Sequence, residues 1–205
     1  MNIITISRQF GSGGRQLGRM IAAQLGYDYY DKEIISAIAA NKGMDENYVK
    51  NALDSNRIQP LRQNYRGSIA RYTTTANTAL MLEEKKIIEE IAKQGRNCVI
   101  VGRNADIILA EYNPMNVFVC ADMASRVQRC VDHAPEGENL TARELEKKIK
   151  RIDKARVKSR RVLTGKEWGG NDAYHLTVNT AGWPAEKLAQ AVADYAVKFF
   201  GRDEK

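Results

Sequence analysis

The sequence predicts an α/β protein built on a parallel sheet. Short apolar runs alternate with longer segments of helical periodicity, as expected when helices join parallel strands. A glycine-rich turn follows the first run directly and leads into a helical pattern. The runs expected to form strands are residues 3–7, 27–31, 98–102, 116–121 and 175–180.

Each predicted element has its own local signal. The third run begins Cys-Val-Ile-Val and is apolar throughout, which is typical of a strand buried on both faces. Helices are predicted where apolar residues recur three or four positions apart and where glycine or proline marks an end. These patterns are Leu17, Ile21 and Leu25 before Gly26; Ile87, Ile88, Ile91 and Ala92 before Gly95; and Leu188, Val192, Tyr195 and Phe199 after Pro184.

Two polar stretches interrupt the alternation, and we predict that both are insertions at strand ends. Residues 32–82 are mostly helix-forming and contain no clear strand, whereas residues 132–172 contain a strongly basic segment. Thr141 and Glu144 form a capping box that marks a helix start in the second stretch. Because ligands bind at the carboxyl ends of strands in open α/β sheets, both insertions are expected beside a ligand site.

The composition is that of a globular protein. Hydrophobic residues make up 43% and charged residues 28% of the 205 residues, and no run reaches the roughly 20 apolar residues of a membrane helix. The first apolar stretch is too short for a secretory leader. The three cysteines form no CxxC pair and favour a reducing compartment, so we predict a cytoplasmic protein.

Positive charge is concentrated in one segment. The net charge is +7, and residues 147–166 alone contribute +9, from ten Lys or Arg and the single acid Asp153. Such a segment indicates an anionic partner, either nucleotide phosphates or a nucleic acid. A nucleic acid is disfavoured because aromatic residues are not interleaved there. The alternative is a solvated, lysine-rich helix.

The strongest local signal is the strand, glycine-rich turn and helix within the first 25 residues. Glycines let the backbone turn tightly and point several N–H groups into one concavity, and the positive end of the next helix adds to this. The alternative is a turn that only packs the helix close to the strand. The residues predicted to bind nucleotide phosphates are Gly11, Ser12, Gly13, Gly14, Arg15 and Gln16.

The turn departs from the GxxxxGK[ST] motif. An ungapped alignment places Gly14 at the motif's lysine and Arg8 at its first glycine. A shift by one residue places Arg15 at the lysine and Gln16 at the Ser/Thr. Both alignments lack the hydroxyl that usually binds Mg²⁺. Arg15 would then supply the missing positive charge, since a guanidinium binds phosphate well.

Together with this turn, four further segments resemble the cytidylate kinase-like family. The segment after the first helix reads YDYYDKEII at 27–35, and the third strand with its Gly-Arg turn reads VIVGRNA at 99–105. The lid reads DKAR at 153–156 with TGKEWG at 164–169, and the last strand reads YHLTVNT at 174–180.

The resemblance implies one kinase-like domain over residues 1–205. Its fold would be the three-layer P-loop fold of nucleoside monophosphate kinases, with a five-stranded parallel sheet of order 2-3-1-4-5. Residues 32–82 would form the acceptor-binding insertion and residues 132–172 a helical lid. The implied reaction is transfer of the γ-phosphoryl group of ATP, with Mg²⁺, to a nucleoside monophosphate or a similar small acceptor.

The resemblance also implies roles for particular residues. The expected catalytic residues are Arg15, Arg103, Asp153 and Arg156. Arg103 would hold the acceptor phosphate, and Arg156 would contact the phosphates while Asp153 orients it or the acceptor. The alternatives are an exposed loop arginine for Arg103 and a helix-surface ion pair for Asp153 and Arg156.

Further candidates for substrate binding are Asp31, Arg103, Arg126, Arg129 and Arg160. Asp31 contacts the acceptor or a metal in one interpretation and caps the helix that begins near Lys32 in the other. For Arg126 and Arg129 a helix-surface position is the alternative. Trp168 is expected to pack the lid against the core, and the alternative is that it stacks on a base. The two histidines, His133 and His175, are isolated and suggest no metal site.

Two other functions remain open at this point. The missing lysine and hydroxyl are compatible with a nucleotide- or anion-binding protein that has a degenerate loop and no catalysis. The basic segment is compatible with nucleic-acid binding, which would weaken steeply with salt.

Overall fold

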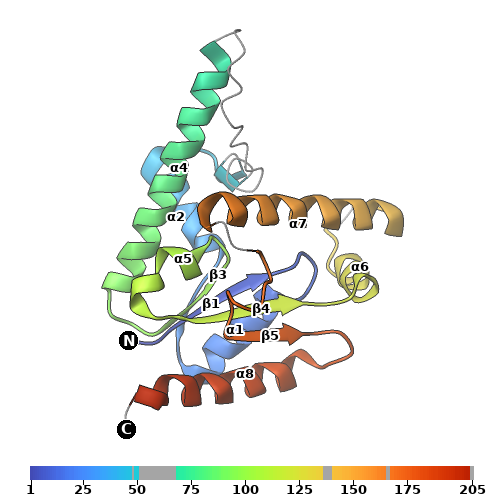
Figure 1. Cartoon of the computed structure of the whole chain (residues 1–205). Helices are drawn as coiled ribbons and strands as arrows, with labels where there is room; N and C mark the ends of the chain where they lie inside the picture. Colours follow the sequence, from blue (N-terminus) through green and yellow to red (C-terminus); the bar gives the residue numbers. More distant parts are fainter. Residues whose placement is uncertain (48, 51–67, 136–139, 165–166, 204–205) are drawn as a thin grey trace.

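Five parallel strands form the centre of the molecule, and helices pack on both faces of the sheet (Figure 1). The structure is a computed structural model that describes residues 1–47, 49–50, 68–135, 140–164 and 167–203. Parts of the predicted acceptor-binding insertion, 48 and 51–67, and of the predicted lid, 136–139 and 165–166, lie outside the described residues.

The strands are β1 (Ile3–Arg8), β2 (Asp28–Tyr30), β3 (Cys98–Val101), β4 (Met115–Cys120) and β5 (Leu176–Asn179). The α-helices are α1 (Gly14–Leu25), α2 (Lys32–Lys42), α4 (Ser68–Lys93), α5 (Ala105–Ile108), α6 (Met123–Asp132), α7 (Ala142–Thr164) and α8 (Ala185–Phe200). The described residues also contain two short 3₁₀ helices, η1 (Ala110–Tyr112) and η2 (Gly201–Asp203).

The sheet has the order β2-β3-β1-β4-β5, which confirms the predicted order. All pairs are parallel, with Ile4 opposite both Val99 of β3 and Met115 of β4. Every predicted strand run contains a strand, with ends that differ by at most one residue. The carboxyl ends of the strands therefore lie at one edge of the sheet, where ligands bind in open α/β sheets.

Successive side chains of a strand point to opposite faces of the sheet, so the hydrophobic core consists of two clusters, one on each face. On one face, Ile3 and Ile100 pack with residues of α2 and α4, including Ile38 and Ile88. On the other face, the next residues along the same strands pack with α1 and α8. These include Ile4, Ile6, Val99, Val101, Leu17, Ile21, Val192 and Phe199. Because both faces are covered, the central strands are apolar almost without interruption.

Local signals explain where several helices begin and end. Gly26 ends α1 in the left-handed conformation, with a φ of 66°, as its position predicts. Pro184 precedes the first residue of α8. The capping box is present, since the Glu144 carboxylate accepts hydrogen bonds of 2.9 and 2.7 Å from the backbone and hydroxyl of Thr141.

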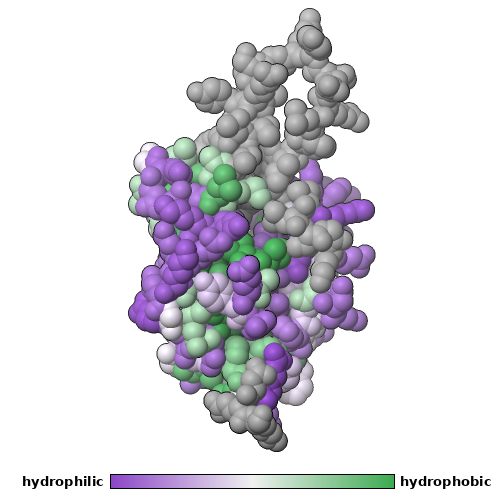
Figure 2. Space-filling view, turned by 60° about the vertical axis from the view of Figure 1, so that its left-hand side comes forward, coloured by the Kyte–Doolittle hydropathy of each residue, from purple (hydrophilic) through white to green (hydrophobic). Residues whose placement is uncertain are grey.

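Helix α7 passes over the carboxyl ends of the strands (Figure 1). Trp168, which follows it, makes an edge contact with Phe118 of β4 at 5.1 Å between ring centroids, and this confirms its packing role. No helix among the described residues is long and apolar enough to cross a membrane. On the face shown in Figure 2, hydrophilic residues cover most of the described surface and hydrophobic ones form smaller groups between them.

Candidate phosphate-binding site

The loop between β1 and α1 can adopt its shape only with glycine at two positions. Gly11 and Gly13 have φ values of 77° and 79°, in the left-handed region that favours glycine. A Cβ atom at Gly11 would lie 2.8 Å from the carbonyl oxygen of Arg126, so α6 also leaves no room for a side chain. The loop backbone is therefore pressed closely against α6.

Helix α1 begins at Gly14 with its backbone N–H groups directed at the loop. The first N–H groups of a helix have no acceptor within it, so those of Gly14, Arg15 and Gln16 can bind an anion. Gly13 is the N-cap residue and has no side chain to occupy this position. The arrangement is that of a phosphate-binding loop at a helix N-terminus.

The two departures from the usual motif, Arg8 and Gly14, lie next to each other in the structure. A Cβ atom at Gly14 would lie only 2.7 Å from the Cβ atom of Arg8. A side chain at the motif's lysine position therefore cannot coexist with one at its first glycine. The arginine that replaces the first glycine thus explains why position 14 is a glycine.

Hydrogen bonds to β4 and β5 hold the loop in place. The Ser12 side chain is buried and donates to the carbonyl oxygen of Gln9 at 2.9 Å. Thr180, at the end of β5, donates from its hydroxyl to the carbonyl oxygen of Ser12 at 2.8 Å. The Gln9 side chain accepts from the backbone of Ala121 at 3.1 Å. The loop is therefore held rigidly against the sheet.

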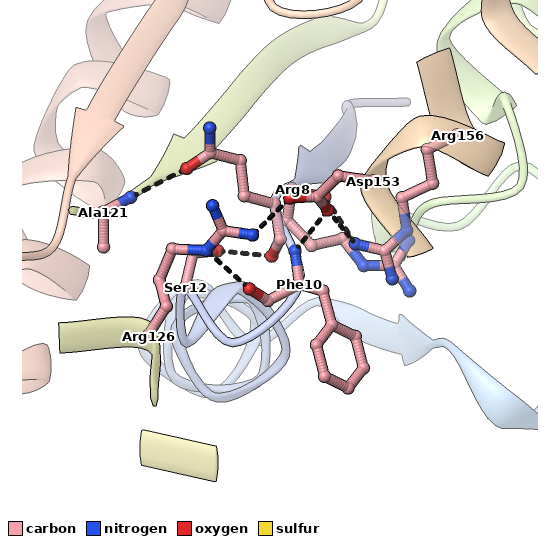
Figure 3. Close-up of polar contacts among 8 residues, drawn as sticks. Arg8, Phe10, Ser12, Ala121, Arg126, Asp153 and Arg156 are labelled. Atoms are coloured by element: carbon pink, nitrogen blue, oxygen red, sulfur yellow. Dashed lines mark hydrogen bonds and ion pairs between the residues drawn. The ribbon is translucent and has the colours of Figure 1, made fainter. Parts of the chain in front are cut away.

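Helix α7 contacts the loop directly (Figure 3). The Asp153 carboxylate accepts a 2.8 Å hydrogen bond from the backbone N–H of Phe10 and forms an ion pair with Arg126. Arg126 in turn donates to the carbonyl oxygen of Phe10 at 2.7 Å, and Arg156 donates to that of Arg8 at 2.7 Å. The predicted lid residues Asp153 and Arg156 thus lie at the loop.

Arg8, Asp31 and Arg15 meet on the other side of the loop. Asp31 lies 2.7 Å from Nε of Arg15 and 3.6 Å from Nη2 of Arg8. Burial and three neighbouring guanidinium groups lower the pKa of Arg8 to about 9, although the Asp31 carboxylate opposes this. Asp31 occupies the N-cap position of α2, but its side chain makes no capping hydrogen bond. Of its two predicted roles, capping is therefore excluded.

Arg103 follows β3 in an unusual backbone conformation. Gly102, Arg103 and Asn104 have φ values of 78°, 59° and 51°, so three successive residues are left-handed. A Cβ atom at Gly102 would overlap the guanidinium of Arg8. Nη1 of Arg103 lies 3.6 Å from the carboxylate of Glu84 on α4. Bulky residues in this region of φ cost free energy, and such positions cluster at functional sites.

The remaining predicted arginines occupy three different environments. Arg160 is 4% exposed and forms an ion pair with Asp106 on α5, away from the loop. Arg126 is 5% exposed and bonds to the loop backbone. Arg129 donates to the carbonyl oxygen of Thr180 at 2.7 Å, and its Nε would lie 3.6 Å from a Cβ atom at Gly13. Of these three, Arg126 and Arg129 therefore lie against the phosphate-binding loop, Arg126 at Phe10 and Arg129 near Gly13.

Sequence reasoning left Arg8 and Glu84 out of the site. The signal for Arg8 was present, because a charged residue replaced the first glycine of a loop motif. Glu84 gave no local signal, since it lies in a polar helix and reaches the site only through the packing of α4 against α5.

A nucleotide phosphate fits this loop, but a magnesium ion held by the protein does not. The loop offers backbone N–H groups and arginines, which suit anions. At the position of the usual hydroxyl ligand stand Arg15 or Gln16, and Asp31 is bound by two arginines. Within the described ranges, no group of three His, Cys, Asp or Glu residues could hold a metal ion.

The sheet order, the glycine loop and the crossing helix are those of the P-loop kinase fold. The chain belongs to the cytidylate kinase-like family, whose model matches residues 3–182. Among the curated proteins, none matches the chain.

Solved structures show the same fold at low identity. An uncharacterized protein from Eubacterium ventriosum is 18% identical, with a TM-score of 0.70 over 96% of this chain and 99% of that one. A shikimate kinase from Acinetobacter baumannii in complex with shikimate is 15% identical, with a TM-score of 0.55 over 97% and 94%. A sugar kinase from Janibacter sp. HTCC2649 is 12% identical, with a TM-score of 0.52 over 95% and 94%.

Proposed function

We propose that the protein is an ATP-dependent phosphotransferase that acts on a nucleoside monophosphate or a similar small acceptor. The observation that carries the proposal is the glycine loop at the N-terminus of α1, which is contacted by arginines of α6 and α7. Family membership supports the reaction class, and the P-loop fold is compatible with it. We also propose that the protein acts in the cytoplasm.

Phosphoryl transfer requires a protein chiefly to position two groups and to neutralise spreading negative charge. In this proposal the backbone of Gly11–Gln16 holds the nucleotide phosphates, with Arg129 beside it. Arg15 and Arg156 stabilise charge on the transferred group, and Arg103 holds the acceptor. Asp153 positions the lid helix on the loop through the N–H of Phe10. Magnesium, when bound to the nucleotide, would neutralise further charge on the phosphates.

Residues 132–172 act as a lid and residues 32–82 contribute to acceptor binding in this proposal. Three contacts of α7, from Asp153, Arg156 and Arg160, reach the ends of β1 and the start of α5. Such contacts would couple movement of the helix to the loop. We propose that Arg160 and Arg126 serve this structural purpose instead of touching the substrate, because both are buried in ion pairs.

The experiment is an ATP-consumption assay with the purified protein over the nucleoside monophosphates and small hydroxyl acceptors. We expect turnover with one acceptor class and a loss of about 100-fold in kcat/KM on Arg15→Met. Arg96→Met is the matched control, because Arg96 is exposed and lies before β3, at the opposite end of that strand. ATP binding without consumption of ATP with any acceptor would replace the proposal by the binding-protein alternative.

A further inference from the structure

The charged residues of helix α7 lie on two opposite sides of the helix. Asp153 and Arg156 contact the glycine loop and β1 (Figure 3), and Arg160 pairs with Asp106 of α5. At about 100° per residue, the exposed cations lie together within about 100° of arc on the opposite side of the helix. These cations, here called the basic stripe, are Arg143, Lys147, Lys150, Arg151, Lys154, Lys158 and Arg161.

The basic stripe accounts for the net charge of the whole chain. Helix α7 has ten Lys or Arg and three acids, so its charge of +7 equals the net charge of the protein. The three cations outside the stripe balance the three acids of the helix, and the rest of the chain has no net charge. From Arg143 to Arg161 the stripe extends about 27 Å along the helix axis. The excess positive charge is therefore arranged in one straight line.

The basic stripe differs from the exposed side of an ordinary solvated helix. Such helices often pair their lysines with acids one turn away. Helix α4 does so, with two lysines at 85 and 86 that pair with glutamates at 89 and 90. Among the described residues, one member of the stripe forms an ion pair of 4.0 Å or less, Lys150 with Glu146 at 3.3 Å. The stripe instead places like charges three or four positions apart, which destabilises a helix and favours an anionic partner.

A nucleic-acid duplex fits the basic stripe better than a membrane or a single strand does. An amphipathic helix binds a membrane by inserting its apolar face, but in α7 that face, with Leu145 and Ile149, is buried in the protein. Single strands bind where bases stack on aromatic side chains, and α7 has no aromatic residue. A duplex encloses its bases and presents one phosphate charge per about 1.7 Å of its axis. A line of cations about 27 Å long therefore matches about 16 phosphates.

We propose that the basic stripe binds the phosphate backbone of double-stranded nucleic acid without reading its sequence. Flexible lysine side chains suit this task, because each ammonium group acts as a point charge and its contact with a phosphate releases counterions. The proposal is independent of the proposed function, since the stripe lies on the side of α7 that faces away from the glycine loop. The duplex and a nucleotide would therefore occupy the protein together, with Asp153 and Arg156 still on the loop.

The test is fluorescence anisotropy of a labelled DNA duplex, and of an RNA duplex of the same sequence, titrated with the full chain over a series of sodium chloride concentrations. Wild type should bind both duplexes with a Kd in the micromolar range at about 50 mM salt. The logarithm of the association constant should fall with that of the salt concentration with a slope of about −4 to −6, because five to seven phosphates are neutralised.

Two triple variants distinguish the basic stripe from the net charge. Each replaces three exposed lysines by glutamine and lowers the net charge from +7 to +4. The stripe variant should weaken binding about tenfold or more at about 50 mM salt and flatten the slope by about 2 to 3, whereas the control should stay within about threefold of wild type. Both should unfold at or above the Tm of wild type, since only exposed lysines change. The stripe variant is Lys147→Gln/Lys154→Gln/Lys158→Gln, and the control is Lys93→Gln/Lys187→Gln/Lys198→Gln.

Four results would overturn the proposal. They are the absence of saturable binding of either duplex by wild type, equal weakening in the two variants, release of the duplex by ATP at constant ionic strength, and preference for a membrane. ATP release would place the duplex in the nucleotide site. Vesicles of phosphatidylcholine and phosphatidylserine test the membrane, which would be the partner if they bind more tightly than the duplex and lose binding in the stripe variant. Absence of phosphotransfer in the ATP assay would count only against the proposed function.

Discussion

Gly11 shows how closely one residue can determine the shape of the phosphate-binding loop. Its φ of 77° is in the left-handed region, and the place of a Cβ atom is occupied by the backbone of α6. Gly26, at the end of α1, has a similar φ of 66°, but nothing lies within 4 Å of its missing Cβ atom. A comparison of Gly11 with Gly26 therefore separates the free-energy cost of a left-handed backbone from the cost of a steric clash.

We predict that Gly11→Ala lowers the free energy of unfolding by about 2–4 kcal/mol, because left-handed alanine and a clash with Arg126 act together. Gly26→Ala should cost only about 1 kcal/mol, since conformation alone is affected. Urea denaturation followed by circular dichroism measures both. Equal losses in the two variants would show that the contact with α6 yields to a methyl group.

Helix α7 is attached to the rest of the molecule along one face. Asp153, Arg156 and Arg160 are three, four and seven residues apart, a spacing that places them on the same side of a helix. The first two contact the backbone of β1 and the loop after it, and the third pairs with Asp106 of α5. The Arg160–Asp106 pair is the most deeply buried of these contacts, with side chains 4% and 3% exposed.

We predict that Asp106→Ala lowers the free energy of unfolding by about 3–5 kcal/mol, because it leaves a buried guanidinium without its carboxylate. The double variant Asp106→Leu/Arg160→Met should recover to within about 1 kcal/mol of wild type, since it removes both charges. Chemical denaturation of the three proteins tests this. The double variant should also bind inorganic phosphate as wild type does. Weaker binding would show that Arg160 contributes to phosphate binding.

At the scale of the whole molecule, the core on the α2–α4 face encloses Cys98. This residue begins β3 and is 1% exposed. Burial raises the pKa of its thiol from 9.0 to about 11. Because the folded value exceeds the unfolded one, the associated stability is fully present below about pH 9 and is lost as the pH rises toward 11.

We predict that Cys98 is alkylated by iodoacetamide only when the whole molecule opens. In a Cys120→Ser/Cys130→Ser background, alkylation at about pH 8 should be slower than in urea by a factor of about 10³ or more. Mass spectrometry gives the rate. The fall in stability above about pH 9 should be smaller in Cys98→Ala than in wild type. Rapid alkylation under native conditions would show that this face opens locally.

Family and fold were accessible from the sequence because their signals are local. A buried parallel strand is apolar in nearly every residue, as in β3, and the motif segments span the chain from β1 to β5. The order of the strands followed from the resemblance and is confirmed. The roles assigned to Arg15, Arg103, Asp153 and Arg156 stay predictions, and the substrate-binding role of Arg129 does as well.

The sequence by itself determined the five strands, the helices with clear periodicity or caps, the position of the glycine loop, and that arginines rather than a lysine accompany it. Only the tertiary structure decided how those arginines are used. It joined Arg8 to Gly14 and to Gly102, buried Arg160 against Asp106, and placed Asp31 between two guanidiniums. The physical reason is range: periodicity and capping act within a few residues, whereas ion pairing joins distant residues such as Arg160 and Asp106, which are 54 positions apart.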